Sequence, residues 1–187
     1  MSRNQKVGGD EKWLHLFLAI GVFWGCSFLF IEQALKFLNP VGVSFLRCLC
    51  GATTIWIIVL IKKIKIPRDR KLWLHVFALA LMTNVIPGTL IALAQTNVTS
   101  VLAGIVNSTT PLTTLLAIML FFRHEKIKSH QVLGLLIGFL GVTMVFGVWR
   151  GLGDNAPWAI GALVVAVTFY GITYPYTTKF VFPHNAR

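Results

Sequence analysis

Long apolar runs alternate with short polar and basic segments along the whole chain. The apolar runs are six in number: Leu14–Leu35, Val41–Ile61, Leu72–Leu93, Val98–Phe122, Val132–Trp149 and Trp158–Phe180. Each run is close to the ~20 residues that a helix needs to cross a bilayer. Because the linkers are short, consecutive helices should be antiparallel neighbours. The pattern predicts an all-α fold, a polytopic membrane bundle of six transmembrane helices.

Composition supports the membrane interpretation. Of the 187 residues, 56% are apolar and only 12% are charged, whereas soluble domains usually have about 25% charged residues. The net charge of +11 would suit a nucleic-acid binder only if the Lys and Arg residues shared a surface with exposed polar and aromatic groups. Here they lie in clusters between the apolar runs. We therefore predict a lipid bilayer as the partner and no nucleic acid.

The basic residues lie unequally on the two sides of the predicted membrane. If the N-terminus is cytoplasmic, the cytoplasmic segments hold all but three of the 17 Lys and Arg residues. The exceptions are Lys36 and Arg150 in outer loops and Arg47 within a span. Cytoplasmic loops of membrane proteins retain Lys and Arg, so both termini should be cytoplasmic. We expect a multi-pass protein of the cell membrane, specifically a bacterial inner membrane.

Two short segments share an aromatic pattern, FWGCSF at residues 23–28 and FYGITY at 169–174. With six antiparallel spans, the first segment lies on an outward-running helix and the second on an inward-running one. Such a relation is typical of an inverted repeat with an odd number of helices per copy. Coincidence stays open as the alternative, because aromatic and small residues are common in membrane helices.

Several short motifs occur in the order found in a known family. The motifs are WG at residues 24–25, FLRCLCGA at 45–52, TSVLAGIVNSTTPLTTLLAIMLFFRHEKI at 99–127 and HQVLGLLIGFLGVTMV at 130–145. Over roughly residues 13–180 the chain resembles EamA-type transporters of the drug/metabolite transporter superfamily. The resemblance implies a ten-helix carrier made of two inverted five-helix repeats. Residues 1–12 would then be a cytoplasmic tail, 13–150 the first repeat, and 151–187 the start of a second repeat, apparently truncated.

An ionisable side chain inside a bilayer needs a partner, a cavity or a route to the interface. Arg47 lies about seven residues, or ~10 Å of helix rise, inside Pro40. Its long stem could reach toward the outer face, where it could meet Glu32. We predict a structural ion pair between Glu32 and Arg47. Contact of Arg47 with a substrate and simple anchoring at the interface stay open as alternatives.

Further polar side chains lie near the middle of their spans. Substrate sites of carriers built from repeats lie near the bilayer midplane, at the repeat interface. Together with Arg47, the candidate substrate-binding residues are Trp24, Ser27, Asn84 and Asn107. Packing is the alternative for Trp24, because a large ring fills space between helices. The Asn107 amide carries two donors and an acceptor, which favours a cavity-lining position.

Small residues and a proline mark helix surfaces that should lie inside the bundle. Gly134, Gly138 and Gly141 share one helical face and include a G-x-x-x-G pair, so we predict close packing against another helix. Pro111 lacks a backbone N–H, so it should leave one carbonyl of its span available near mid-membrane.

No motif indicates an enzyme, a metal site or a cofactor. The segment HEKIKSH at residues 124–130 places two histidines six residues apart, whereas the zinc metalloprotease motif requires them four apart. The sequence also lacks a G-x-S-x-G elbow and a Gly-rich phosphate loop. We therefore expect no catalytic activity, no metal and no cofactor.

These patterns together favour a secondary transporter that moves a small metabolite across the cell membrane by alternating access. The chain would be a partial or half-size carrier that needs a second half or a second copy of itself. The alternative is a non-transporting remnant or a regulatory subunit of a full-length relative. Substrate, direction of transport, coupling ion and oligomeric state stay open at this point.

Overall fold

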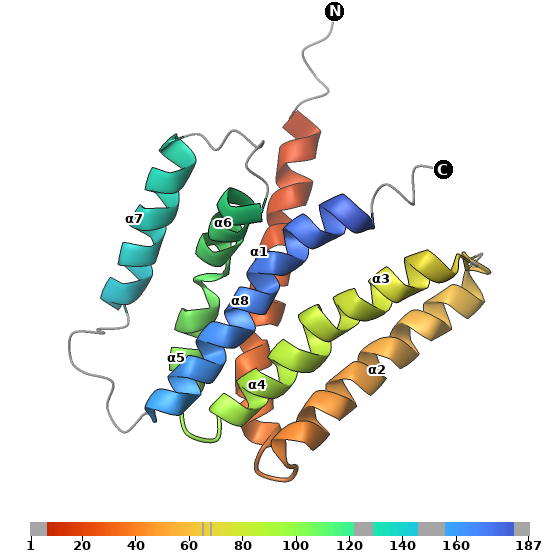
Figure 1. The fold of residues 1–187 in the computed structure, drawn as a ribbon, viewed down its shortest axis with the longest axis horizontal. Helices are drawn as coiled ribbons and strands as arrows, with labels where there is room; N and C mark the ends of the chain where they lie inside the picture. Colours follow the sequence, from red (N-terminus) through yellow and green to blue (C-terminus); the bar gives the residue numbers. More distant parts are fainter. Residues whose placement is uncertain (1–6, 65, 68, 122–128, 146–155, 182–187) are drawn as a thin grey trace, which may run out of the picture.

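The computed structural model of the chain describes residues 7–64, 66–67, 69–121, 129–145 and 156–181 (Figure 1). Within these ranges the chain forms helices joined by turns and contains no β-strand. The elements are α1 (Val7–Ala34), α2 (Pro40–Ile61), α3 (Arg70–Ala80), the π-helical segment η1 (Leu81–Val85), α4 (Ile86–Ala94), α5 (Ser100–Asn107), α6 (Thr110–Phe121), α7 (Ser129–Val145) and α8 (Pro157–Phe180). The predicted all-α fold class is confirmed.

Five helical rods are long and apolar enough to cross a bilayer. α1, α2 and α8 each form one rod, α3 continues through η1 into α4, and α5 continues into α6. These rods correspond to five of the six predicted spans. The remaining predicted span, Val132–Trp149, contains the shorter apolar helix α7, and its last residues lie outside the described part of the chain. The chain is therefore a multi-pass membrane bundle.

The α5–α6 rod is interrupted at residues 108–109, just before Pro111. The hydroxyls of residues 108–110 donate to backbone carbonyls three positions earlier, at 2.6–2.7 Å. These local hydrogen bonds compete with those of the helix. One of them runs from the Thr110 hydroxyl to the Asn107 carbonyl, which Pro111 cannot bind because it lacks an N–H. The carbonyl that we predicted to be available therefore has a partner.

The α3–α4 rod is widened by one π-helical turn. At the end of η1 the N–H of Ile86 bonds to the carbonyl of Leu81, five residues earlier. Pro87 follows directly in the first turn of α4. A π-helical turn lets a proline follow without breaking the helix completely, since the backbone register shifts by one residue. The rod thus continues through the membrane past its proline.

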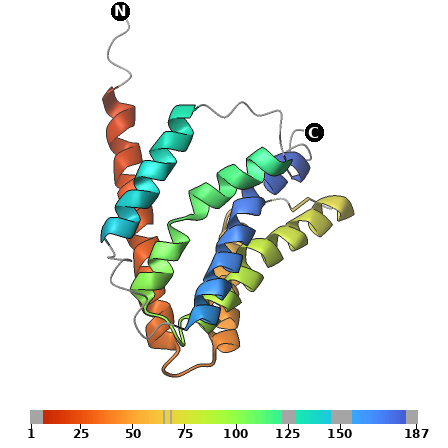
Figure 2. The same ribbon diagram turned by 60° about the vertical axis from the view of Figure 1, so that its left-hand side comes forward.

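α8 is the central helix of the bundle and packs mainly against α4 and α6 (Figures 1 and 2). Its buried face carries small residues, among them Ala159 and Ala166, both 0% exposed, which let neighbouring backbones approach closely. The tightest crossing is at Gly171, where an added Cβ would lie 2.7 Å from the carbonyl carbon of Thr113 in α6. α1, by contrast, packs chiefly against α5.

α7 makes few close contacts with the other described helices. A Cβ built at Gly134, Gly138 or Gly141 would meet no heavy atom within 4 Å among the described residues. The close packing predicted for these three glycines therefore stays a prediction.

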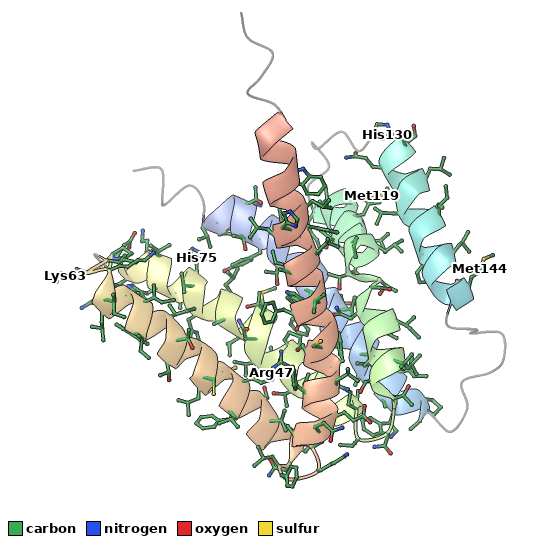
Figure 3. The ribbon with its side chains drawn as sticks, turned by 180° about the vertical axis from the view of Figure 1, so that it is seen from behind. Arg47, Lys63, His75, Met119, His130 and Met144 are labelled. Atoms are coloured by element: carbon green, nitrogen blue, oxygen red, sulfur yellow. The ribbon has the colours of Figure 1, made fainter. Side chains whose placement is uncertain are left out.

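α1 begins and α8 ends at the same end of the bundle, and the two helices run in opposite directions (Figure 1). The same end of the bundle carries Lys63, just after α2, and His75, in α3 (Figure 3). FWGCSF on α1 and FYGITY on α8 therefore point opposite ways along the bundle, as predicted for an inverted pair.

Candidate functional site

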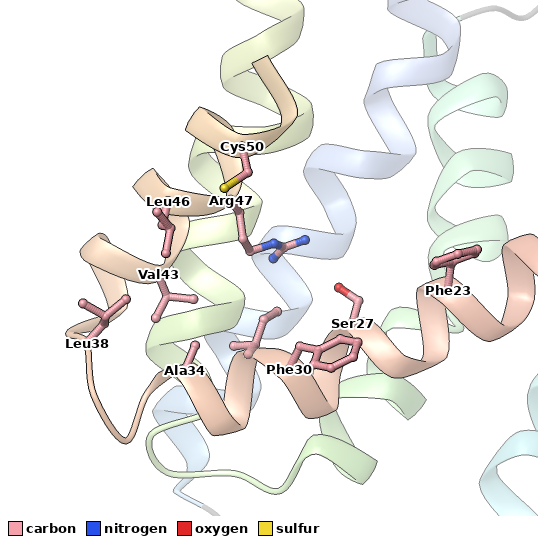
Figure 4. A pocket seen from close by; sticks show the side chains of 10 residues that line it. Phe23, Ser27, Phe30, Ala34, Leu38, Val43, Leu46, Arg47 and Cys50 are labelled. Carbon is pink, nitrogen blue, oxygen red and sulfur yellow. The ribbon is translucent and has the colours of Figure 1, made fainter. Parts of the chain in front are cut away.

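Two pockets flank the C-terminal half of α1. The first, which we call the α1–α2 pocket, has a volume of about 370 Å³, and the second, the α1–α5 pocket, about 450 Å³. The α1–α2 pocket is lined by Phe23, Ser27, Phe30, Ile31, Ala34, Leu38, Val43, Leu46, Arg47 and Cys50 (Figure 4). The α1–α5 pocket is lined by Trp24, Gly25, Phe28, Leu29, Ser100, Val101, Gly104, Asn107 and Ser108. Both volumes lie in the range of small-molecule pockets.

Arg47 extends from α2 into the α1–α2 pocket, and the Ser27 hydroxyl on α1 points toward it (Figure 4). Figure 3 shows Arg47 between the helices, far from Lys63 at the end of the bundle. In the described part of the chain, the guanidinium makes no hydrogen bond or ion pair, although its charge acts on the Tyr170 hydroxyl of α8. Arg47 is thus an exposed cation inside a membrane span, and its neighbours in the pocket lining are mainly apolar.

Glu32 does not form the predicted ion pair with Arg47. Its carboxylate accepts a short hydrogen bond from the hydroxyl of Ser100 on α5. The buried amide of Gln95 donates to the Ser100 oxygen at 3.1 Å and to the Phe28 carbonyl at 3.0 Å. This network joins the C-terminal part of α1 to α5 and to the end of α4. Because Ser100 rather than Arg47 contacts the carboxylate, the two charges remain separate in this conformation.

Trp24 lies against Tyr170 of α8 in an edge-to-face arrangement, with ring centroids 6.5 Å apart and planes at 78°. Both rings occupy the second position of the repeated segments FWGCSF and FYGITY. The contact brings the two segments together at the middle of the bundle. Tyr170 was not among the predicted site residues, although its position in the repeat would have identified it.

Asn107 lines the α1–α5 pocket from the end of α5. Its Oδ1 atom is buried and has no hydrogen-bond partner among the described residues. A buried acceptor without a donor costs about 1–3 kcal/mol, so it is rarely retained without a reason. The geometry suits a ligand N–H or a bound water at this position.

Asn84 lies apart from the other predicted site residues. It is exposed on η1, donates to the Thr83 hydroxyl at 2.7 Å and lines neither of the two pockets. The structure therefore brings Trp24, Ser27, Arg47 and Asn107 to the two sides of α1 and leaves Asn84 outside. Across the described ranges, no three His, Cys, Asp or Glu side chains gather as metal ligands would.

Comparison with known proteins gives relatives that align with two thirds or more of this chain. An uncharacterised transporter of Archaeoglobus fulgidus is 31% identical over 136 residues, which is 72% of this chain and 47% of the relative. Protein PagO of Salmonella typhimurium is 28% identical over 88% of this chain and 54% of its own length. The uncharacterised transporter YrdR of Bacillus subtilis is 29% identical over 68% of the chain and 41% of its own length.

The chain spans about half the length of the curated relatives it matches. No solved structure matches it. The sequence profile of the EamA-like transporter family matches residues 11–147, which include every predicted site residue. The family resemblance in the sequence is thereby confirmed, and the chain belongs to the EamA-like transporter family of membrane transporters.

Proposed function

We propose that this chain forms the first half of a secondary transporter, and that the two pockets beside α1 are part of the path of a small metabolite. The observation that carries the proposal is the pair of polar groups facing α1 from both sides. Arg47 on α2 and the side-chain Oδ1 of Asn107 on α5 have no hydrogen-bond partner among the described residues. Polar groups inside a membrane bundle usually mark a solute path.

The proposal assigns residues 13–150 to a first five-helix repeat and 151–187 to the start of a second, inverted one. The contact between Trp24 and Tyr170 supports this assignment, because equivalent positions of the two repeats would meet near their symmetry axis. The second half would come from another polypeptide, from residues beyond Arg187, or from a second copy of the chain. Each of these would enclose the face of α1 that the described helices leave exposed.

The proposed orientation places both termini in the cytoplasm, in a bacterial inner membrane. It is supported by the basic residues at the end of the bundle where α2 ends, α3 begins and α8 ends. They are Lys62, Lys63, Arg70, Lys71 and Lys179. Lys36, between α1 and α2, lies at the opposite end. This asymmetry is the one that positions a protein in the membrane during insertion.

Metabolite release from membrane vesicles tests the proposed function. Inverted vesicles from cells that express the chain retain any separate second half, and they would be loaded with a ¹³C-labelled extract of small metabolites. We expect at least one solute to leave faster than from vesicles without the chain, and Asn107→Ala to slow its release. Asn84→Ala is the matched control, because this asparagine lies outside both pockets. Equal release from all vesicles would support the regulatory or remnant alternative.

A further inference from the structure

Arg47 carries a charge that the described part of the chain does not neutralise. A guanidinium stays protonated in proteins, so it cannot avoid the cost of a membrane interior by losing its proton. Such residues in membrane spans are normally paired or face a water-filled cavity. The α1–α2 pocket supplies the Ser27 hydroxyl and otherwise apolar side chains. Arg47 is exposed in the described bundle, so a negatively charged ligand can reach the guanidinium and supply the partner that the described residues do not.

The acidic residues whose side chains the structure describes are Glu32 and Asp69, and both have other partners. Glu32 accepts the hydrogen bond from Ser100. Asp69 caps α3 and accepts from the N–H of Lys71 at 2.9 Å, in the loop that follows the far end of α2. The Tyr170 hydroxyl is near Arg47 but offers a dipole, not a full charge. Neither carboxylate in the described residues is therefore available to Arg47.

The other lining residues define the remainder of the ligand. Phe23 and Phe30 of α1 and Leu46 of α2 make the rest of the lining mostly apolar and exposed (Figure 4). A ligand that fits both features has an anionic group at one end and an apolar body. The planar guanidinium presents parallel N–H groups that match the two oxygens of a carboxylate or phosphate. The Ser27 hydroxyl is placed to add a third donor.

We propose that the α1–α2 pocket binds a small amphiphilic organic anion, with its carboxylate or phosphate on Arg47 and its apolar body between α1 and α2. The inference rests on the proposed function and specifies the chemical class of its solute. The same chemistry can come from a free solute or from the headgroup and first methylenes of an anionic lipid. The volume of about 370 Å³ accommodates a molecule with one aromatic ring.

The test is binding to the full chain purified in a neutral detergent, measured as ligand-induced thermal stabilisation. The probes are phenylacetate, phenylacetamide and phenethylamine, which share one apolar body and differ in charge. We expect phenylacetate to bind about ten- to hundredfold more tightly than the amide, as for a charge-assisted hydrogen-bond pair. Phenethylamine should bind least well, because two cations repel. This comparison uses only the natural chain, so it does not depend on any variant folding.

Substitutions at Arg47 then test whether the preference for the anion depends on this residue. Arg47→Gln should abolish the preference for phenylacetate over the amide, and Arg47→Lys should retain part of it, since the charge stays but the planar fork is lost. Lys36→Gln removes the same charge in the loop after α1 and should leave the preference unchanged. Each variant is used only if it elutes as the natural chain does in size-exclusion chromatography.

A parallel titration with short-chain phosphatidylglycerol and phosphatidylcholine identifies the source of the anion. Arg47-dependent stabilisation by phenylacetate indicates a free solute, whereas stabilisation by phosphatidylglycerol alone indicates a lipid. Equal binding of phenylacetate and phenylacetamide, with no effect of either lipid, would overturn the inference. So would an unchanged preference in a folded Arg47→Gln variant. Binding is measured without transport, so a failure of the vesicle assay leaves this result interpretable.

Discussion

The segments FWGCSF on α1 and FYGITY on α8 share a pattern but lie in opposite environments. On α8, Gly171 is buried and lies so close to α6 that an added Cβ would be 2.6 Å from the Thr113 hydroxyl. On α1, a Cβ at the equivalent Gly25 would meet nothing within 4 Å, and the neighbouring Phe23 is 79% exposed. The same glycine therefore serves close packing in one helix and borders a pocket in the other.

The different surroundings of Gly25 and Gly171 indicate the structural role of the glycine in this pattern. A glycine between aromatic residues lets a second helix approach, and on α8 that helix is α6, whose Thr113 hydroxyl also donates to the Val167 carbonyl at 3.1 Å. On α1 no described helix takes the corresponding place. The surface of α1 around Gly25 is therefore free to contact a solute, a second half, or both. The equivalent surface of α8 around Gly171 is already packed against α6.

The largest expected difference in stability is between alanine substitutions at the two equivalent glycines, Gly171 and Gly25. Gly171→Ala should lower the free energy of unfolding by about 2 kcal/mol, because the new methyl group overlaps backbone as well as side-chain atoms of Thr113. Gly25→Ala should leave it unchanged or raise it by up to about 1 kcal/mol, as helix propensity favours alanine. Unfolding in mixed detergent micelles measures both. Equal destabilisation would mean that α1 is packed as closely as α8.

The next effect concerns the network that attaches α1 to α5. A double-mutant cycle of Glu32→Gln and Ser100→Ala should give a coupling of about 1.5 kcal/mol, as for a hydrogen bond to a charged group. The cycle of Glu32→Gln and Arg47→Gln should give a coupling near zero. A larger coupling to Arg47 than to Ser100 would restore the ion pair that the sequence predicted and remove the need for an external anion.

A smaller coupling is expected between the two repeated segments themselves. Trp24→Leu and Tyr170→Leu should show a coupling of about 1 kcal/mol in the free energy of unfolding, as for an edge-to-face aromatic pair. Trp13 and Phe17, 6.3 Å apart within α1, provide a matched pair whose loss should not affect the α1–α8 contact. Additive effects of the first two substitutions would show that the segments do not meet.

Asn107→Leu should cost no stability. This change removes a buried acceptor without a described partner, so the free energy of unfolding should stay level or rise by up to about 1 kcal/mol. Solute release in the vesicle assay should nevertheless fall, because the α1–α5 pocket loses its amide. A large loss of stability would instead show that Asn107 has a structural partner.

The sequence predicted the spans well and the contacts between them poorly, for physical reasons. Spans are recognised from hydropathy over about 20 consecutive residues, which is a local property. Helix starts are local too: the Asn39 side chain accepts from the N–H of Gly42 at 2.6 Å and so caps the start of α2. The partner of Glu32 depends on how α1 and α5 are rotated against each other, and the two contacting residues are 68 positions apart in the sequence. Gln95 was missed because nothing local distinguishes a buried amide at a helix end from an exposed one.

The site was predicted in part for similar reasons. Depth in the span suggested Trp24, Ser27 and Asn107, and a charge inside a span suggested Arg47; all four line one of the two pockets beside α1. Depth alone also selected Asn84, although the π-helical turn of η1 leaves it apart from both pockets. The rotation of a helix about its axis decides which mid-span residues meet, and that rotation is set by packing partners far away in the sequence.

The most direct test of the account is the reaction of two single cysteines with a water-soluble maleimide in membrane vesicles, in a chain without its natural cysteines. Gly25→Cys on α1 borders the α1–α5 pocket, and Ala166→Cys on α8 is 0% exposed in the core. The account predicts that Gly25→Cys is labelled and Ala166→Cys is not. If Gly25→Cys stays as unreactive as Ala166→Cys, the face of α1 borders no aqueous path and the proposed role of its pockets is contradicted.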